Sequence, residues 1–360
     1  MKRTSMILNL PSAGAIALAA VALALLVASP GSATAPKSPG APSLFPTAPD
    51  FKIYDPHPPS LDEGHPDVAY NPQEDEYLVV FDRESSTGDL DVYGIVVEAG
   101  APASSLIPIG VHPDFDDSHP AVAYNPDARS YLVVWQRSHH AESYRAIAGS
   151  MVTTAAGAPF TIHGTLHGDQ RRPDVAYASV PERFLVVWES HEPFTHPPDI
   201  VGTTVDSAGA DISPAITVSL EGTTTGEQTT PAVAACAPTG RWLVAWTDNR
   251  RSGPSGADIY AQQVKYAEGA VSLWSGVLPV GAVASWAGAP AVAWGPVGEG
   301  DSQFLVAWTD NADTTYARRV EADNTLFDLL QVSDTQNSKA AAAVTFAAGS
   351  HDWWVVWDSG

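Results

Sequence analysis

The amino-acid sequence predicts an all-β chain built from six copies of one four-stranded unit. Each copy joins a segment of the Pro-x-Val-Ala-aromatic kind, weaker in the sixth copy, to a Leu-Val-Val-Trp-like segment at a nearly constant spacing: fifteen residues separate Pro66 from Phe81 and Pro173 from Trp188. No window of the sequence shows a sustained helical period. Repeats of roughly 40 to 50 residues with several strands each are typical of a β-propeller. We therefore expect a six-bladed β-propeller of four-stranded blades, whose copies start near residues 66, 120, 173, 231, 290 and 342.

The first copy illustrates the four strands expected in each blade. Strand A is the small and β-branched segment Pro66–Tyr70, and strand B is Tyr77–Phe81, an apolar run suited to burial on both faces. A polar loop leads to strand C at Asp91–Gly94, and the short strand D follows at Ser105–Ile109. Four strands in this order predict an antiparallel meander.

The two ends of the repeat region suggest how the ring closes. The last copy stops at Gly360, just after its strand B, whereas Phe51–Tyr54 precedes Pro66 by about the distance that separates a strand D from the next blade. We expect this N-terminal strand to close the last blade, because closure removes exposed sheet edges. The alternative is a truncated chain, since strand C of the last blade has no evident source.

The first fifty residues differ in character from the repeats. Lys2 and Arg3 precede an apolar run that ends in small residues, which predicts a signal peptide over residues 1–35. Residues 36–50 are rich in Pro, Ala and Ser and predict a flexible linker before the propeller at 51–360. We expect a secreted or periplasmic protein; a retained membrane anchor is the alternative.

The charge balance excludes several classes of partner. The chain carries 18 Lys and Arg against 41 Asp and Glu, a net charge of −23. Nucleic acids and anionic membrane surfaces need clustered cations, so neither is an expected partner. A single cysteine excludes an intrachain disulfide framework. We expect a monomer with no membrane span after removal of the signal peptide.

The repeat also resembles a known group of proteins. Its Pro-x-Val-Ala-Tyr, Tyr-Leu-Val-Val-Trp and Asp-Ile-Tyr-Gly-like segments are similar to the unit of secreted bacterial β-propeller repeat proteins, over about residues 51–360. The resemblance implies a propeller fold and an export route. That group is largely uncharacterised, so the resemblance implies no catalytic residues.

Repetition separates scaffold from candidate site. Aromatic residues that end every strand B, such as Trp135, are expected to fill the space between blades. Histidines are distributed differently: ten of the eleven fall in D–A or B–C connections, which emerge on the same face of a meander, and the fourth and fifth copies contribute none. The alternative without a functional role is that these histidines are solvated side chains of the loops.

Residues at the start of strand A sharpen this pattern. The position before the proline holds His65, His119 and Arg172 in the first three copies, and Asp67 and Asp174 follow nearby. The later copies carry small or neutral residues there. Polar groups that converge in one sector of a concave surface indicate a ligand site. The binding candidates are His65, His119, Arg171, Arg172, His139, His140, His191, His196 and Asp116.

Three functions are compatible with this pattern. The first is a binding module for a carbohydrate, a surface polymer or an exported protein. The second is an enzyme on polysaccharides, for which the catalytic candidates are His65, His119, Asp67, Asp174 and Glu189: a hydrolase needs paired carboxylates, whereas a lyase would use a histidine base with Arg172. The third is a structural module. No cofactor is evident, but a divalent metal is possible, with His139, His140, His191 and His196 as weak candidate ligands.

Overall fold

The computed structural model describes most of the repeat region. The described residues are Ile53 and residues 62–85, 89–98, 101–102, 105–140, 144–164, 168–191, 197–219, 226–250, 256–281, 286–296, 302–333, 342–347 and 352–357. The predicted signal peptide and linker lie outside this set. Among the described residues there is no helix with the length and hydropathy needed to cross a bilayer.

The first three blades follow the chain order as antiparallel sheets. Blade one contains β1 (Glu63–Asn71), β2 (Glu76–Glu84), β3 (Leu90–Glu98), β4 (Ala101–Pro102) and β5 (Ile107–Gly110). Blade two contains β6 (Phe115–Asn125), β7 (Ser130–His139), β8 (Arg145–Val152) and β9 (Phe160–His163). Blade three contains β10 (Asp169–Ala178), β11 (Arg183–His191), β12 (Asp199–Asp206) and β13 (Ile216–Thr217).

The last three blades repeat this order. Blade four contains β14 (Gln228–Cys236), β15 (Arg241–Asp248), β16 (Asp258–Ala267), β17 (Ala270–Leu273) and β18 (Leu278–Gly281). Blade five contains β19 (Ala291–Pro296), β20 (Ser302–Thr309), β21 (Thr315–Glu321) and β22 (Leu330–Gln331). Blade six contains β23 (Ala342–Ala347) and β24 (Asp352–Trp357). In blades one and four, two short segments pair with different parts of the third strand and together form its outer edge.

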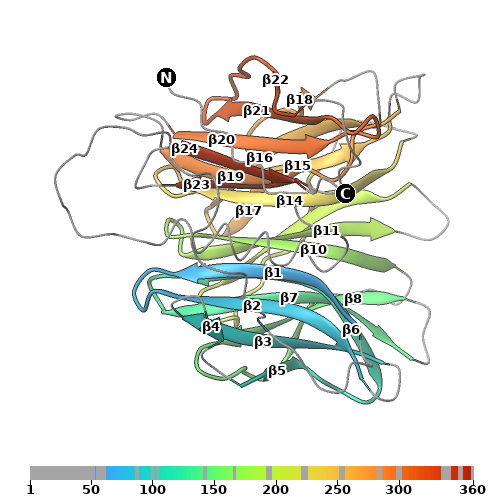
Figure 1. The fold of residues 1–360 in the computed structure, drawn as a ribbon, viewed down its shortest axis with the longest axis vertical. Coiled ribbons are helices and arrows are strands. Elements are labelled where there is room, and N and C mark those ends of the chain that lie inside the picture. Colours follow the sequence, from blue (N-terminus) through green and yellow to red (C-terminus); the bar gives the residue numbers. More distant parts are fainter. Residues whose placement is uncertain are drawn as a thin grey trace.

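The sheets succeed one another around a common axis, which confirms the predicted all-β, six-bladed β-propeller. The first strand of each blade contacts the first strand of the next, in the order β1, β6, β10, β14, β19 and β23. Figure 1 shows this succession from the blue and teal strands of the first two blades to the orange and red strands of the last two. The innermost strands therefore line the axis, and their starts form a rim.

Apolar side chains fill the space between neighbouring blades. Trp135, Trp188, Trp246 and Trp308 are fully buried, as the repetition predicts, and each belongs to a cluster shared by two adjacent sheets. Close packing explains a glycine at the end of β18: a Cβ at Gly281 would collide with the ring of Trp308 in the next blade. A tryptophan buries a large apolar area, so these contacts hold the blades in order.

A repeated backbone irregularity marks the inner strand of blades one to four. The register shifts at the same place in each pair of first and second strands, between Gly64 and Asp67 in blade one. The residue before the proline has a left-handed backbone in all four blades, with φ of 44°, 54°, 47° and 51° at His65, His119, Arg172 and Thr230. Positive φ is uncommon for residues other than glycine. This bulge turns the side chain of that residue out of the regular alternation of the strand.

The expected closing strand lies largely outside the described residues. Of Phe51–Tyr54, the structure describes Ile53, which packs against the cluster of Tyr77, Val79 and Phe81 in blade one. This cluster lies on the face of blade one opposite to blade two. The pairing of the N-terminal segment with blade six stays a prediction.

Candidate functional site

In blades one, three and four the bulge places one side chain beside the second strand of its own blade. His65 Nδ1 lies 2.8 Å from Asp82 Oδ2, and Arg172 Nη1 lies 3.1 Å from Glu189 Oε1. Thr230 and Thr247 are joined in the same way in blade four, with 2.8 Å between their hydroxyl oxygens. The offset is 17 residues in all three pairs. Blades one, three and four therefore each present one exchangeable side-chain pair at the rim, whereas Gln136 of blade two donates to Ser118 instead.

The second-strand residue also ties its blade to the next one. The backbone N–H of His119 donates to Asp82 Oδ2 (2.8 Å), and that of Thr230 donates to Glu189 Oε1 (2.7 Å). At the interface between blades two and three the acceptor is Gln136, whose Oε1 lies 3.1 Å from the nitrogen of Arg172. Because a neutral amide performs this task in blade two, the carboxylates of Asp82 and Glu189 are not required by the backbone link alone.

We use the name rim site for His65, Asp82, His119, Arg172, Glu189 and His191. Within it, the rings of His65 and His119 are stacked, with centroids 3.6 Å apart. Asp82 is nearly buried below them, with 3% of its side chain exposed, whereas 51% of His65 is exposed. Burial, helped by the neighbouring His65, lowers the pKa of His119 to about 4. His119 is therefore a neutral imidazole at physiological pH, and its buried Nδ1 lacks a hydrogen-bond partner among the described residues.

The blade-three part of the rim site is an ion-pair network around Glu189. This carboxylate is 1% exposed, and Arg172 and His191 both lie against it, with His191 Nε2 at 3.2 Å from Oε2. Burial raises the pKa of Glu189, but hydrogen bonds from His191, the Thr230 backbone and Arg172 outweigh it and hold the pKa below its usual value. Half of the Arg172 side chain remains exposed, so the buried carboxylate fixes a guanidinium that still faces outward.

Asp67 and Asp174 lie on the inner strands, next to the rim site. Asp67 Oδ2 accepts the backbone N–H of Val122 in blade two (2.8 Å), and Asp174 Oδ2 accepts that of Val233 in blade four (2.7 Å). Burial raises the pKa of Asp67 to about 6. Burial and repulsion from Asp67 together raise the pKa of Asp174 to about 7. Both groups therefore titrate near neutral pH while tying neighbouring blades together.

The remaining candidates form separate groups. His139 contacts Phe115 edge-on at 5.1 Å, and His140 lies 3.4 Å from Asp116, all on the extended hairpin of β6 and β7. Arg171 pairs with Asp169, which Arg145 of blade two also contacts. His196 lies outside the described residues.

Of the metal ligands suggested by the sequence, the structure describes His139, His140 and His191. Among the described residues, the group of histidine and carboxylate side chains with ligand atoms all within 4.8 Å of one another is His65, Asp82 and His119. His139, His140 and His191 are not part of it.

Sequence reasoning overlooked Asp82 and Gln136. Both directly follow the aromatic residue that ends strand B, at the position that Glu189, Thr247 and Thr309 occupy in other blades. This repeat position always holds a polar residue whose type varies between these blades, and that variation could have indicated a site.

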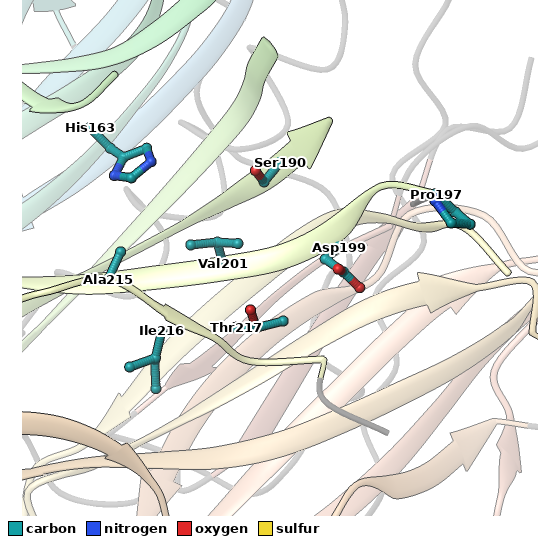
Figure 2. A pocket seen from close by; sticks show the side chains of 8 residues that line it. All are labelled: His163, Ser190, Pro197, Asp199, Val201, Ala215, Ile216 and Thr217. Carbon is teal, nitrogen blue, oxygen red and sulfur yellow. The ribbon is translucent and has the colours of Figure 1, made fainter. Parts of the chain in front are cut away.

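A cavity of about 250 Å³ lies on the same face, farther from the axis. Figure 2 shows His163 of blade two on one side and Ser190, Asp199 and Thr217 of blade three around the rest, with Val201 and Ile216 as its apolar lining. Its polar residues come from the D–A and B–C ends of the strands, as do those of the rim site.

The fold is shared with several solved proteins at low sequence identity. An α-L-arabinanase from Penicillium chrysogenum, solved with arabinobiose, is 10% identical with a TM-score of 0.55, over 82% of this chain and 92% of that one. The α-L-arabinofuranosidase Arb93A from Fusarium graminearum is 11% identical with a TM-score of 0.54, over 78% and 84%. The Hadza microbial sialidase Hz136 is 10% identical with a TM-score of 0.54; the match covers 79% of this chain but spans only 61% of the sialidase. No family model matches the sequence, and no curated protein matches it.

Proposed function

We propose that this chain is an exported β-propeller that binds a carbohydrate through the face carrying the rim site. The observation that carries the proposal is the presentation of two exposed basic side chains, His65 and Arg172, each fixed by a nearly buried carboxylate. Hydrogen-bond donors held in place lose little entropy on binding a ligand. Sugar hydroxyl and carboxylate oxygens are acceptors that such donors fit.

The other features of this face support the same proposal. The cavity beside His163 offers polar side chains and an apolar floor at the same end of the blades, which suits one sugar unit. The rigid sheets hold these groups, so the loops are free to vary. The structurally similar proteins named above are an arabinanase, an arabinofuranosidase and a sialidase, all named for activities on sugars. A surface polymer or an exported protein is the other ligand class for this face.

Export is part of the proposal. It rests on the leader-like residues 1–35, the linker-like residues 36–50 and the resemblance to secreted bacterial propeller repeats. Expression of the full chain in a bacterium, followed by N-terminal sequencing of the protein in the medium or periplasm, tests it. A protein retained in the cell with an intact N-terminus contradicts it.

An enzyme acting on polysaccharides is the second candidate. Asp67 and Asp174 favour it, because their raised pKa values leave a transferable proton near neutral pH. Binding is preferred because oxygens of both carboxyls are occupied by backbone N–H groups of the next blade. If the parent chain releases reducing ends from arabinan and the Asp174→Asn variant does not, the enzyme is favoured instead.

The decisive experiment compares two matched variants. Residues 36–360 are titrated with arabinobiose, arabinan and 3′-sialyllactose, and binding is measured by calorimetry. We expect Arg172→Ala to weaken binding by about tenfold or more, which corresponds to about 1.4 kcal/mol. Thr230→Ala is the control, since Thr230 occupies the same left-handed position in blade four. Equal binding by the two variants, or no binding of any glycan in a wider array, contradicts the proposal.

A further inference from the structure

We propose that His65, Asp82 and His119 form a binding site for a divalent transition-metal ion such as Zn²⁺ or Ni²⁺, between blades one and two. The three side chains offer two imidazole nitrogens and one carboxylate oxygen within 4.8 Å of one another. Nitrogen and oxygen donors of this kind suit zinc, nickel and copper rather than calcium or magnesium. The proposal does not depend on carbohydrate binding.

The repeat frame shows that the fold does not demand this combination. The corresponding acceptor of the next interface is Gln136, which makes the same backbone link without a charge. The corresponding left-handed residues of blades three and four are Arg172 and Thr230, neither of which is a metal ligand. Two imidazoles therefore surround one buried carboxylate at repeat positions that hold different residues in other blades, although the same backbone link is made there.

The state of His119 supplies a second argument. Its Nδ1 is buried and has no hydrogen-bond partner among the described residues. A buried polar atom without a partner is costly, so a ligand for this ring would remove an unfavourable feature.

His65 is the most exposed of the three ligands. Asp82 is held by the backbone N–H of His119, and His119 belongs to the ordered bulge. His65 is half exposed, and binding a metal ion would exchange its Nδ1 hydrogen bond to Asp82 and its stack on His119 for a bond to the ion. Ligands of one zinc ion lie about 2.0–2.2 Å from it, so a rotation of the His65 ring is needed to close the set. Three protein ligands leave a further position that faces solvent and is open to water or an oxygen ligand.

For the test, a protein of residues 36–360 is first stripped of metal with EDTA and dialysed. It is then titrated with ZnSO₄ and, separately, with CoCl₂. We expect one equivalent of Zn²⁺ to bind in calorimetry, and visible absorption bands of Co²⁺ in a site of low coordination number. His65→Ala, His119→Ala and Asp82→Asn should each weaken binding by more than about tenfold. Asp82→Asn keeps an oxygen for the His119 N–H, which separates metal binding from folding.

His140→Ala is the control, because His140 pairs with Asp116 on the same face but outside the site. Its binding should equal that of the parent chain. Absence of binding at about 0.1 mM Zn²⁺, or equal losses in His140→Ala and His119→Ala, would overturn the proposal. Loss of metal binding with retained glycan binding would leave the proposed function intact.

Discussion

The backbone N–H of Thr230 donates to the nearly buried carboxylate of Glu189 across the boundary between blades three and four, over 2.7 Å. The same link joins blades one and two, and blades two and three, through Asp82 and Gln136. A strained, left-handed residue in the inner strands of blades two, three and four is therefore stabilised from outside its own blade.

The first prediction concerns this link. Glu189→Ala leaves the Thr230 N–H, Arg172 and His191 without their shared acceptor. We expect the free energy of unfolding to fall by about 1–3 kcal/mol, measured by urea denaturation. Glu189→Gln should lose less, because an amide oxygen serves as the acceptor in blade two. A larger loss in Glu189→Gln than in Glu189→Ala would show that the link is not the main contribution.

The second prediction concerns a buried ion pair in blade two. Arg137 donates two hydrogen bonds to Asp117, at 2.8 and 2.6 Å, and Asp117 is fully buried. Arg137→Ala leaves that carboxylate unpaired, so we expect a loss of about 3–5 kcal/mol. The double variant Arg137→Met/Asp117→Asn should recover part of the stability. Equal stability of Arg137→Ala and the parent chain in urea would show that this ion pair does not stabilise the folded state.

The third prediction concerns pH. The pKa of Asp174 rises from 3.8 in the unfolded chain to about 7 in the folded one, so the folded state binds this proton more tightly. Its contribution to stability is complete below about pH 4 and is lost as the pH rises to about 7. Asp174→Asn should therefore flatten the dependence of the unfolding midpoint on pH between 4 and 8. An unchanged slope would mean that Asp174 does not carry this titration.

The fourth prediction concerns the two-residue turn between β16 and β17. Glu268 and Gly269 both have positive φ, 55° and 81°, as a type I′ hairpin turn requires. Asparagine tolerates this backbone better than glutamate, so Glu268→Asn should raise the free energy of unfolding by up to about 1 kcal/mol. Gly269→Ala should lower it by a similar amount, although no atom lies within 4 Å of the added Cβ. Thermal denaturation measures both, and a stabilising Gly269→Ala would refute the turn assignment.

The sequence predicted the blades well because their signals are local. Pro66–Tyr70 and Tyr77–Phe81 have the apolar pattern of paired strands, and β1 and β2 pair them as expected. The buried Trp135 and Trp188 follow from repetition alone. The split outer edges of blades one and four were not predicted. Strands β4 and β17, which pair with β3 and β16, are too short to show the alternation of apolar and polar residues that marks a strand.

The residues of the candidate rim site could be proposed from the sequence only in part. His65, His119 and Arg172 were found because they vary at a fixed position of the repeat. Asp82 was not, because its importance comes from contacts with His65 and with the backbone of His119, 37 residues away. The repeated apolar segments therefore determined by themselves the number of blades and their order along the chain, and they predicted one face for the D–A and B–C connections. Only the tertiary structure decided which of those side chains touch, because that depends on the left-handed bulges and on the packing of one sheet against the next.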